Sequence, residues 1–480
     1  MPAPAAIAPL HAPPLFPASG VDRALPVSGG LAGPVTGPLG LSVAFGAHPL
    51  DATPGWTRLD AGITGLGVNK VSIKRGRPTE RDQTGVGTMT AVAIDTVGVL
   101  DPTNSGSAFV NQLDPIKQIA YALQNPVTST WSTLFRGFID DWNHDLTGLD
   151  KSASFDRVEI ACSDAFEIIG GAEVVPDQAG NTVPGESVGS VYYDPVTITS
   201  DRVLAAIADT ATTLNPYGGD WPAALLEIFT GNVKLKAGVY SSQTALLQVI
   251  LDAANAEFPG VANFFVAKDG KLTFHGRFAR FNPTDPDYHI ATWKVGDTAA
   301  FSADSTVAVI SDLQFTRGAA NLINAAIATP KGIKDADIAG QFVSDAASVS
   351  KYGARSISFP DLLTDGHSDG STTDLQETKL FPTYYVDNYK DPRSRISQIV
   401  VRSQPTTSAY GPNVWALLCG IDISDIVHVK TTHPGGGGFN EDFYVEGITY
   451  EIVPMTATSP DVTLTLDVSP KAYYDTDPFS

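Results

Sequence analysis

The chain has 480 residues, a length that accommodates about three domains of ordinary size. Charged residues make up 17% of it, below the roughly 25% of a typical soluble domain, which favours a surface covered by partners over a free monomer. The net charge of −21 argues against sequence-specific nucleic-acid binding; it is typical of a protein kept soluble by its charge, and a negative wall that repels phosphates would also suit a channel for DNA.

The cysteine and hydropathy patterns narrow the class of protein further. Two cysteines, Cys162 and Cys419, do not make a disulfide framework, so we expect buried reduced thiols and assembly in a reducing host cytoplasm. No apolar run reaches the roughly 18 residues that a membrane span needs. Prolines near the N-terminus interrupt any signal-peptide helix, so we predict neither a membrane span nor a signal peptide.

Residues 1–40 contain nine prolines, many alanines and almost no charge. Proline fixes φ and removes a hydrogen-bond donor, so this stretch is predicted to be extended. Its scattered leucines favour an arm that lies on a neighbouring chain over a solvated linker.

Residues 41–170 carry the signature of a first β domain. Val71, Ile73 and Arg75 alternate with polar residues, and a strand from Phe135 to Trp142 contains a glycine. A period of two with β-branched residues predicts strands.

Residues 171–395 mix helical and strand patterns, which predicts an α/β insertion. A helix capped by Ser200 is expected, with apolar residues on one side as far as Leu214, and further helices are expected after Pro222 and over 243–257. A hairpin is predicted around Asp269-Gly270 because this dipeptide supplies the positive φ of a tight turn. Residues 300–395 are expected to be irregular with a few short helices.

Residues 396–480 return to a β pattern. Strands are predicted over 396–401 and 426–429, and the alternation of Trp415, Leu417 and Cys419 predicts another. A phase slip at Gly447 indicates a β-bulge.

The two β regions end in a similar way. In each, a glycine-interrupted strand is followed by a polar turn and an alternating strand that ends in serine, at Ser163 and at Ser469. We therefore predict an α+β, mostly β fold, in which two barrel-like antiparallel β domains flank the mixed α/β insertion.

Seven segments stand in a characteristic order along the chain. They are Val71-Ser-Ile-Lys-Arg-Gly-Arg77, Gly85-Val-Gly-Thr88, Val99-Leu-Asp-Pro102, Leu134-Phe-Arg-Gly-Phe-Ile139, Ile421-Asp-Ile-Ser-Asp-Ile-Val427, Phe443-Tyr-Val-Glu-Gly-Ile448 and Leu464-Thr-Leu-Asp-Val-Ser-Pro470. None of them is diagnostic alone, but in this order they resemble the minor tail proteins of long-tailed, siphovirus-type actinobacterial phages.

That family in turn is similar to the baseplate or tail-tip hub proteins. The resemblance implies a structural protein of the virion, in which a homotrimer with two barrel-like domains per chain imitates a six-fold ring and lines part of the DNA-exit channel during genome ejection. It implies contacts with the distal tail or tube protein, the tape-measure protein and other tail-tip proteins. No cofactor is implied.

Two candidate sites for chemistry are weighed against ordinary surface roles. Asp365-Gly-His-Ser-Asp-Gly370 resembles the start of a calcium loop, but a histidine at its third position and Gln376 at its twelfth suit Ca²⁺ poorly. Asp140 and Asp141 are neighbours on a predicted strand, where adjacent side chains point to opposite faces and cannot share a substrate. We therefore predict no catalytic residue and no metal ligand.

Two further segments are candidates for contacts with partners. Lys74, Arg75 and Arg77 form the densest basic cluster, which would either meet an acidic neighbouring subunit or form a solvated turn. Gly435, Gly436, Gly437 and Gly438 precede a strand rather than a helix, so they favour a projecting loop over a phosphate site.

Three alternatives to the hub remain open. A distal tail protein would form a hexameric adaptor ring, and six copies per virion instead of three would distinguish it. A tail-associated cell-wall or glycan hydrolase would need two carboxylates converging in one cleft. A receptor-binding module would be marked by a cluster of sugar-stacking aromatic residues.

Overall fold

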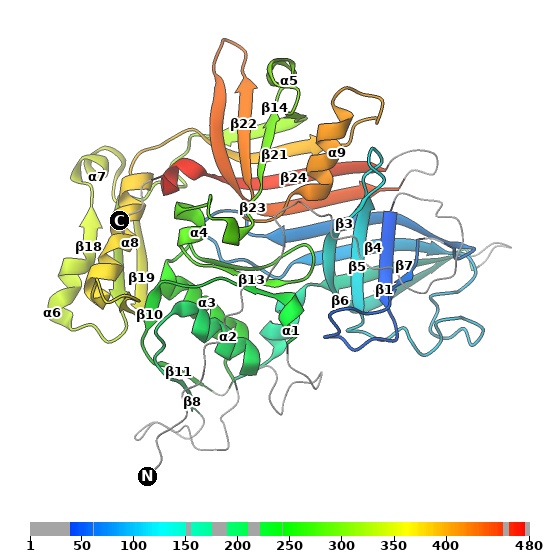
Figure 1. Cartoon of the computed structure of the whole chain (residues 1–480), viewed down its shortest axis with the longest axis horizontal. Helices are drawn as coiled ribbons and strands as arrows, with labels where there is room; N and C mark the ends of the chain where they lie inside the picture. The colour runs from blue at the N-terminus through cyan, green and yellow to red at the C-terminus, as the bar shows by residue number, and fades with distance from the viewer. Residues whose placement is uncertain are drawn as a thin grey trace.

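The computed structural model describes residues 39–60, 62–149, 155–174, 190–209, 221–241, 243–454 and 460–475. The arm predicted for residues 1–40 lies outside the described residues except for its last two positions. Fourteen strands of the described chain join into one large sheet, and helices and smaller sheets lie beside it (Figure 1). The chain is therefore mostly β within the α+β class, as the sequence predicts.

The large sheet consists of two sets of seven strands. The first set contains β1 (Leu39–Ala44), β2 (Thr57–Arg58), β3 (Leu66–Gly76), β4 (Thr88–Asp95), β5 (Gln118–Gln124), β6 (Trp131–Thr147) and β7 (Phe155–Ser163). The second set contains β14 (Thr292–Gly296), β15 (Ala308–Val309), β16 (Asp312–Thr316), β21 (Arg395–Arg402), β22 (Ile426–Thr432), β23 (Gly438–Val453) and β24 (Asp461–Pro470).

The two sets have the same strand order. The first follows β2-β1-β5-β6-β7-β4-β3 and the second follows β15-β14-β22-β23-β24-β21-β16, which is the same path when each strand is numbered by its rank in its set. They differ at one end, where β1 pairs antiparallel to its neighbours and β14 pairs parallel. Barrel closure is not detected in either set among the described residues.

Both sets are organised around one long, bent strand. The first half of β6 pairs with β5 and its second half pairs with β7, and the change of partner comes at Phe138. β23 changes from β22 to β24 in the same way around Tyr444. The bulge predicted at Gly447 is confirmed, and β6 has a corresponding bulge between Ile139 and Asp141.

The elements between the two sets form a mixed layer, drawn mainly in green in Figure 1. They are α1 (Ala165–Gly171), β8 (Ser190–Tyr193), α2 (Thr199–Asp209), η1 (Ala223–Leu225), β9 (Leu226–Ile228), β10 (Val233–Leu235), β11 (Gly238–Ser241), α3 (Leu246–Glu257), β12 (Asn263–Val266), β13 (Leu272–His275), α4 (Phe278–Phe281) and η2 (Pro286–Tyr288). The hairpin β12–β13 turns at Gly270, whose φ of +86° confirms the predicted turn.

The second strand set is itself interrupted. The interrupting elements are α5 (Thr298–Ala303), β17 (Ala325–Pro330), α6 (Asp335–Ile338), η3 (Ala339–Gln341), β18 (Phe342–Ser344), α7 (Ala346–Tyr352), β19 (Ser356–Leu362), β20 (Thr364–His367), α8 (Asp374–Tyr389) and α9 (Gly411–Gly420), and η4 (Lys471–Tyr474) follows β24. Strands β14 and β16 lie within 171–395, so the stretch treated as an insertion also supplies strands to the second set.

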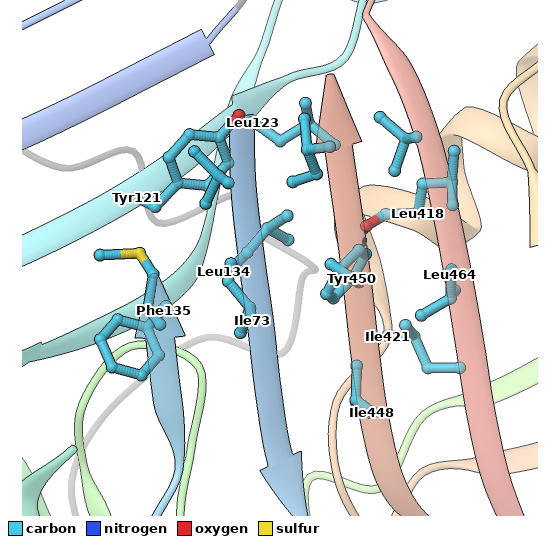
Figure 2. Packing of buried hydrophobic residues seen from close by; sticks show 14 of the residues in the cluster. Ile73, Tyr121, Leu123, Leu134, Phe135, Leu418, Ile421, Ile448, Tyr450 and Leu464 are labelled. Atoms are coloured by element: carbon cyan, nitrogen blue, oxygen red, sulfur yellow. Dashed lines mark hydrogen bonds between the residues drawn. The ribbon is translucent and has the colours of Figure 1, made fainter. Parts of the chain in front are cut away.

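The main hydrophobic core is shared by both strand sets. Figure 2 shows Ile73 of β3 beside Tyr450 of β23, and Leu418 and Ile421 near Tyr450 and Leu464 in the same cluster. The Tyr450 hydroxyl donates a hydrogen bond to the Leu418 carbonyl oxygen at 2.8 Å, so this buried polar atom is satisfied. Because one apolar cluster fills both sets, we expect them to unfold as one unit.

Three predictions of local structure are wrong. The strand expected at Trp415 is helix α9, because Val414 and Leu418 are buried as well and give the period of a helix. The helix expected after Pro222 is a single 3-10 turn followed by β9, which pairs with β13. Residues 300–395 are more regular than expected, since they include α8 and a three-stranded sheet.

Helix α2 differs from its prediction at its start. α2 begins at Thr199, so Ser200 lies within the helix rather than at its cap. The end predicted for this helix, at Leu214, lies outside the described residues.

Candidate functional site

The two strand sets meet along one pair of strands. β3 of the first set pairs antiparallel with β23 of the second, from Val71 opposite Ile452 to Gly76 opposite Gly447. The backbone is close-packed where this ladder ends. Gly76 has a φ of +86°, and a Cβ at this position would clash with the Glu446 carbonyl oxygen. We call this junction the seam.

A first ion pair crosses the seam next to the core. The Arg75 side chain is buried, and its Nη1 lies 2.8 Å from Asp422 Oδ1. The Lys268 backbone N–H also donates to Asp422, at 2.9 Å. Burial alone would raise the pKa of Asp422, but Arg75 and Lys268 hold it below its usual value. Asp422 is therefore a fixed negative charge that joins β3 to the loop before β22.

A second, fully buried network lies at the bulge of β23. Arg77 Nε donates to Glu446 Oε2 at 2.8 Å, and Arg280 of α4 donates to both oxygens of the same carboxylate. The Ser469 hydroxyl donates to Glu446 Oε1 at 2.5 Å. Burial would raise the pKa of Glu446, but Arg280 and Arg77 lower it to about 2. This carboxylate stays ionised, and it accepts hydrogen bonds from the end of β3, from α4 and from β24.

An aromatic cluster continues the seam toward α8. Its members are Phe258, Phe381, Tyr384, Tyr385, Tyr389, Tyr444, Tyr473 and Tyr474. Within it the Tyr389 hydroxyl donates to the buried Glu80 carboxylate, and the Arg395 guanidinium lies 4.6 Å from the centroid of the Tyr389 ring. Helix α8 and the C-terminal turn η4 are thereby fixed to the strand sets.

The carboxylates of the seam are held in fixed positions. Asp422 and Glu446 each accept hydrogen bonds from guanidinium, backbone or hydroxyl donors. A pocket of about 520 Å³ lies elsewhere, between η2 and β22, and is lined in part by Pro286, His289, Ile426 and Lys471. Asp442 also lines it and pairs with His428 at 2.7 Å.

The basic cluster singled out in the sequence is divided by the structure. Arg75 and Arg77 are buried and make their contacts inside the chain, so they form neither a solvated turn nor a surface for partners. Lys74 is exposed, as alternation along β3 requires. The prediction of a partner contact stays with Lys74 alone in this cluster.

The glycine run forms the tip of the hairpin between β22 and β23. Gly435 and Gly436 have φ values of +92° and +88°, and a Cβ at either would meet no atom within 4 Å. The hairpin projects from the sheet at the top of Figure 1. Its role in contacting a partner stays a prediction.

The other sequence candidates occupy structural positions. Asp140 is the bulged residue of β6 and accepts a hydrogen bond from the Ser163 hydroxyl at 2.6 Å, and both Asp140 and Asp141 are exposed. Gln376 forms a capping box with Thr373 at the start of α8, so its amide is used within the helix rather than over the loop 365–370. The thiols of Cys162 and Cys419 are buried, as predicted.

Glu446 and Arg280 were missed by the sequence analysis, although a signal existed. Glu446 is a charged residue between Val445 and Gly447 in a strand whose other central residues are apolar, and such a carboxylate is rarely buried without a partner. The partner, Arg280, lies in a short helix 166 positions away, and no local pattern connects the two.

No known protein-family model matches this sequence, and no curated protein sequence matches it. Among the described residues, no helix is long and apolar enough to cross a membrane. A tail protein from Neisseria meningitidis MC58 aligns with a TM-score of 0.50 and 11% identity over 91% of this chain and 98% of its own. This chain has the fold of that tail protein.

Two prophage proteins align less closely. The 43 kDa tail protein of prophage MuSo2 from Shewanella oneidensis has a TM-score of 0.47 and 12% identity over 91% of this chain and 99% of its own. The prophage tail protein gp18 from Listeria monocytogenes EGD-e has a TM-score of 0.42 and 9% identity over 89% and 94% of the two chains. We infer the fold from the similarity to the Neisseria protein alone.

Proposed function

We propose that this chain is a structural, non-enzymatic protein of a phage tail and acts as the hub of the tail tip. In this role it joins the tail tube to the components that recognise the host, and it resides in the virion after assembly in the host cytoplasm. The fold that it shares with the Neisseria tail protein over nearly the whole of both chains supports this role.

The repeated strand set is the observation that carries the proposal. A homotrimer of chains with two similar sets each presents six similar units around one axis, and it still has three-fold symmetry for the other partners. Such a ring matches a six-fold tube on one side and a three-fold tip on the other. The charge of −21 fits a wall past which DNA must move without binding.

A structural role also fits the way in which the charged side chains are used. Asp422 and Glu446 are held by cations and fix the two sets to each other, and Asp140 is held by a serine at a bulge. The exposed Lys74 and the loop 435–438 are the places where we expect contacts with the distal tail or tube protein and with the tape-measure protein.

The number of copies per tail tests the proposal. Quantitative mass spectrometry of purified virions, with isotope-labelled peptides of this chain and of the tube protein, is expected to give three copies. Six copies would point to a distal adaptor ring instead. Absence from the tail, or clearing of peptidoglycan or polysaccharide by the purified chain, would contradict the proposal.

A further inference from the structure

The first strand set contains a strand edge that is equivalent to the one at the seam but is not paired within the described chain. β23 carries β24 on one edge and β3 on the other along residues 447–453. The equivalent half of β6, residues 141–147, carries β7 on one edge, and no other strand of the described chain pairs with it. Its residues are mostly exposed, including Leu146 at 56%.

The equivalence of β6 and β23 holds at the level of single residues. Phe138 pairs with Ser163, and Tyr444 pairs with Ser469. After one further residue each strand has its bulge, and the bulged carboxylate accepts a hydrogen bond from that serine, at 2.6 Å in the first set and 2.5 Å in the second. Asp140 therefore corresponds to Glu446.

The loops before β5 and β22 match as well. Ile116 and Ser424 both have positive φ, at 64° and 71°. The N–H of Ile116 donates to the Ile139 carbonyl oxygen, and the N–H of Ser424 donates to the Val445 carbonyl oxygen. Counting back two residues from each places Asp114 of the first set at the position of Asp422 in the second.

A strand equivalent to β3 exists in the second set. β16 pairs with β21 as β3 pairs with β4, and the sequence Leu313-Gln-Phe-Thr-Arg-Gly318 parallels Val71-Ser-Ile-Lys-Arg-Gly76. Arg317 thus corresponds to Arg75. Unlike β3, β16 pairs with β21 alone among the described strands.

The side chains of β16 are more exposed than those of β3: Leu313 is half-buried where Val71 is buried, and the later residues of β16 are exposed. Phe315 is 51% exposed, although one face of its ring stacks on His433, whereas Ile73 at the equivalent position is fully buried. Arg317 and Asp114 are both exposed, and Arg317 forms no ion pair among the described residues. An unpaired strand edge with exposed apolar side chains is a template for pairing with another chain.

We propose that β16 of one copy of this chain pairs with the open edge of β6 of a second copy and repeats the seam between molecules. The register follows from the seam: Gly318 lies opposite Asp141 and Leu313 lies opposite Leu146 of the neighbour. Arg317 pairs with the neighbour's Asp114, as Arg75 pairs with Asp422. The contact is head-to-tail, and such a contact gives a closed ring when the rotation between copies closes and an open filament when it does not; the proposed trimer requires the closed ring.

This interface rests on the proposed assembly function and adds the surfaces that form it. One difference from the intrachain seam follows from the sequence. Arg77 corresponds to Ala319, so the neighbour supplies no arginine to Asp140 from this strand. The intermolecular seam therefore has one buried ion pair where the intrachain seam has two.

A cross-linking experiment tests the register. In the variant with Asn143→Cys and Thr316→Cys the two thiols face each other across the interface, and a short bismaleimide is expected to give covalent dimers and trimers on a denaturing gel. The matched control combines Asn143→Cys with Ser358→Cys, an exposed position on β19, and is expected to stay monomeric on the gel. Equal cross-linking of both variants, or none, would overturn the interface.

A charge-reversal series gives a second readout on folded protein. Arg317→Glu and Asp114→Arg alone are each expected to weaken association at least tenfold in analytical ultracentrifugation, and the double variant is expected to recover most of it. Lys334→Glu, at an exposed cation on another face, serves as the control. Circular dichroism confirms that each variant is folded. No recovery in the double variant would refute the pairing of Arg317 with Asp114.

The mass of the assembly separates this inference from the proposed function. Three copies without the cross-link would refute the interface and leave the hub standing. Six copies with the cross-link would support the interface and contradict the trimer. A chain that stays monomeric at high concentration would refute the interface, and the copy number in purified virions would still decide the hub.

Discussion

Arg77 and Glu446 are 369 positions apart in the chain, yet their side chains meet at 2.8 Å with both fully or almost fully buried. This contact joins the end of β3 to the bulge of β23 and so fixes the two strand sets to each other. The ladder between β3 and β23 sets their register, and the ion pair fixes where that ladder ends.

Loss of one partner of this pair is expected to lower the free energy of unfolding substantially. Arg77→Met leaves the Glu446 carboxylate with Arg280 and Ser469 only, and breaking a buried pair destabilises a protein by about 3–5 kcal/mol. Urea denaturation followed by tryptophan fluorescence measures the change. Arg157→Met, which removes an exposed pair with Glu159, is the control and should change stability by less than about 1 kcal/mol. Equal effects of the two would contradict a special role for the seam.

The lowered pKa of Glu446 predicts that the stability of the folded chain depends on pH. The pKa of Glu446 is about 2 in the folded chain and 4.5 without the fold, so its stabilising contribution is complete above about pH 4.5 and is lost as the pH falls toward 2. The difference corresponds to about 3 kcal/mol. The free energy of unfolding should therefore fall more steeply over this interval in the wild type than in Glu446→Gln. Parallel curves for the two proteins would count against this prediction.

Gly76 is expected to tolerate no side chain. Its positive φ would strain an alanine by roughly 1–2 kcal/mol, and a Cβ there would also collide with the Glu446 carbonyl oxygen. Gly435 has a similar φ, but its surroundings are open. Gly435→Ala should therefore lower the free energy of unfolding by the backbone strain alone. Thermal denaturation is expected to show a clearly larger loss for Gly76→Ala than for Gly435→Ala. A similar loss in both would show that the backbone is not close-packed at the seam.

The two thiols are expected to be inert in the folded chain. Cys162 and Cys419 are buried, and burial raises the pKa of the Cys162 thiol well above its usual value. A thiol reagent such as DTNB should react with neither under native conditions and with both in denaturant. Rapid reaction of the native protein would contradict the core assignment.

Much of the fold could be predicted from local pattern, because alternation and turn residues act over short distances. The bulge at Gly447, the hairpin at Gly270 and the two similar strand pairs that end at Ser163 and Ser469 were all visible in this way. Helix α9 could not be predicted in this way, because the alternation of Trp415, Leu417 and Cys419 leaves out the apolar residues between them.

The candidate site was less accessible to sequence analysis. Arg75 and Arg77 look like a basic surface cluster, and only the pairing of β3 with a strand far along the chain places them in the interior. Asp422 and Glu446 become their partners through the same long-range contact. The equivalence of β16 with β3 also depends on strand order, because the two segments share few identical residues.

A cryo-EM reconstruction of the assembled tail would show both the number of copies of this chain and the strands that pair between neighbouring copies. We expect three copies of this chain in one ring, with six similar strand sets around the axis and β16 of each copy paired with β6 of the next. A single copy on the axis, or a ring in which β16 and the outer half of β6 both face solvent, would contradict the account.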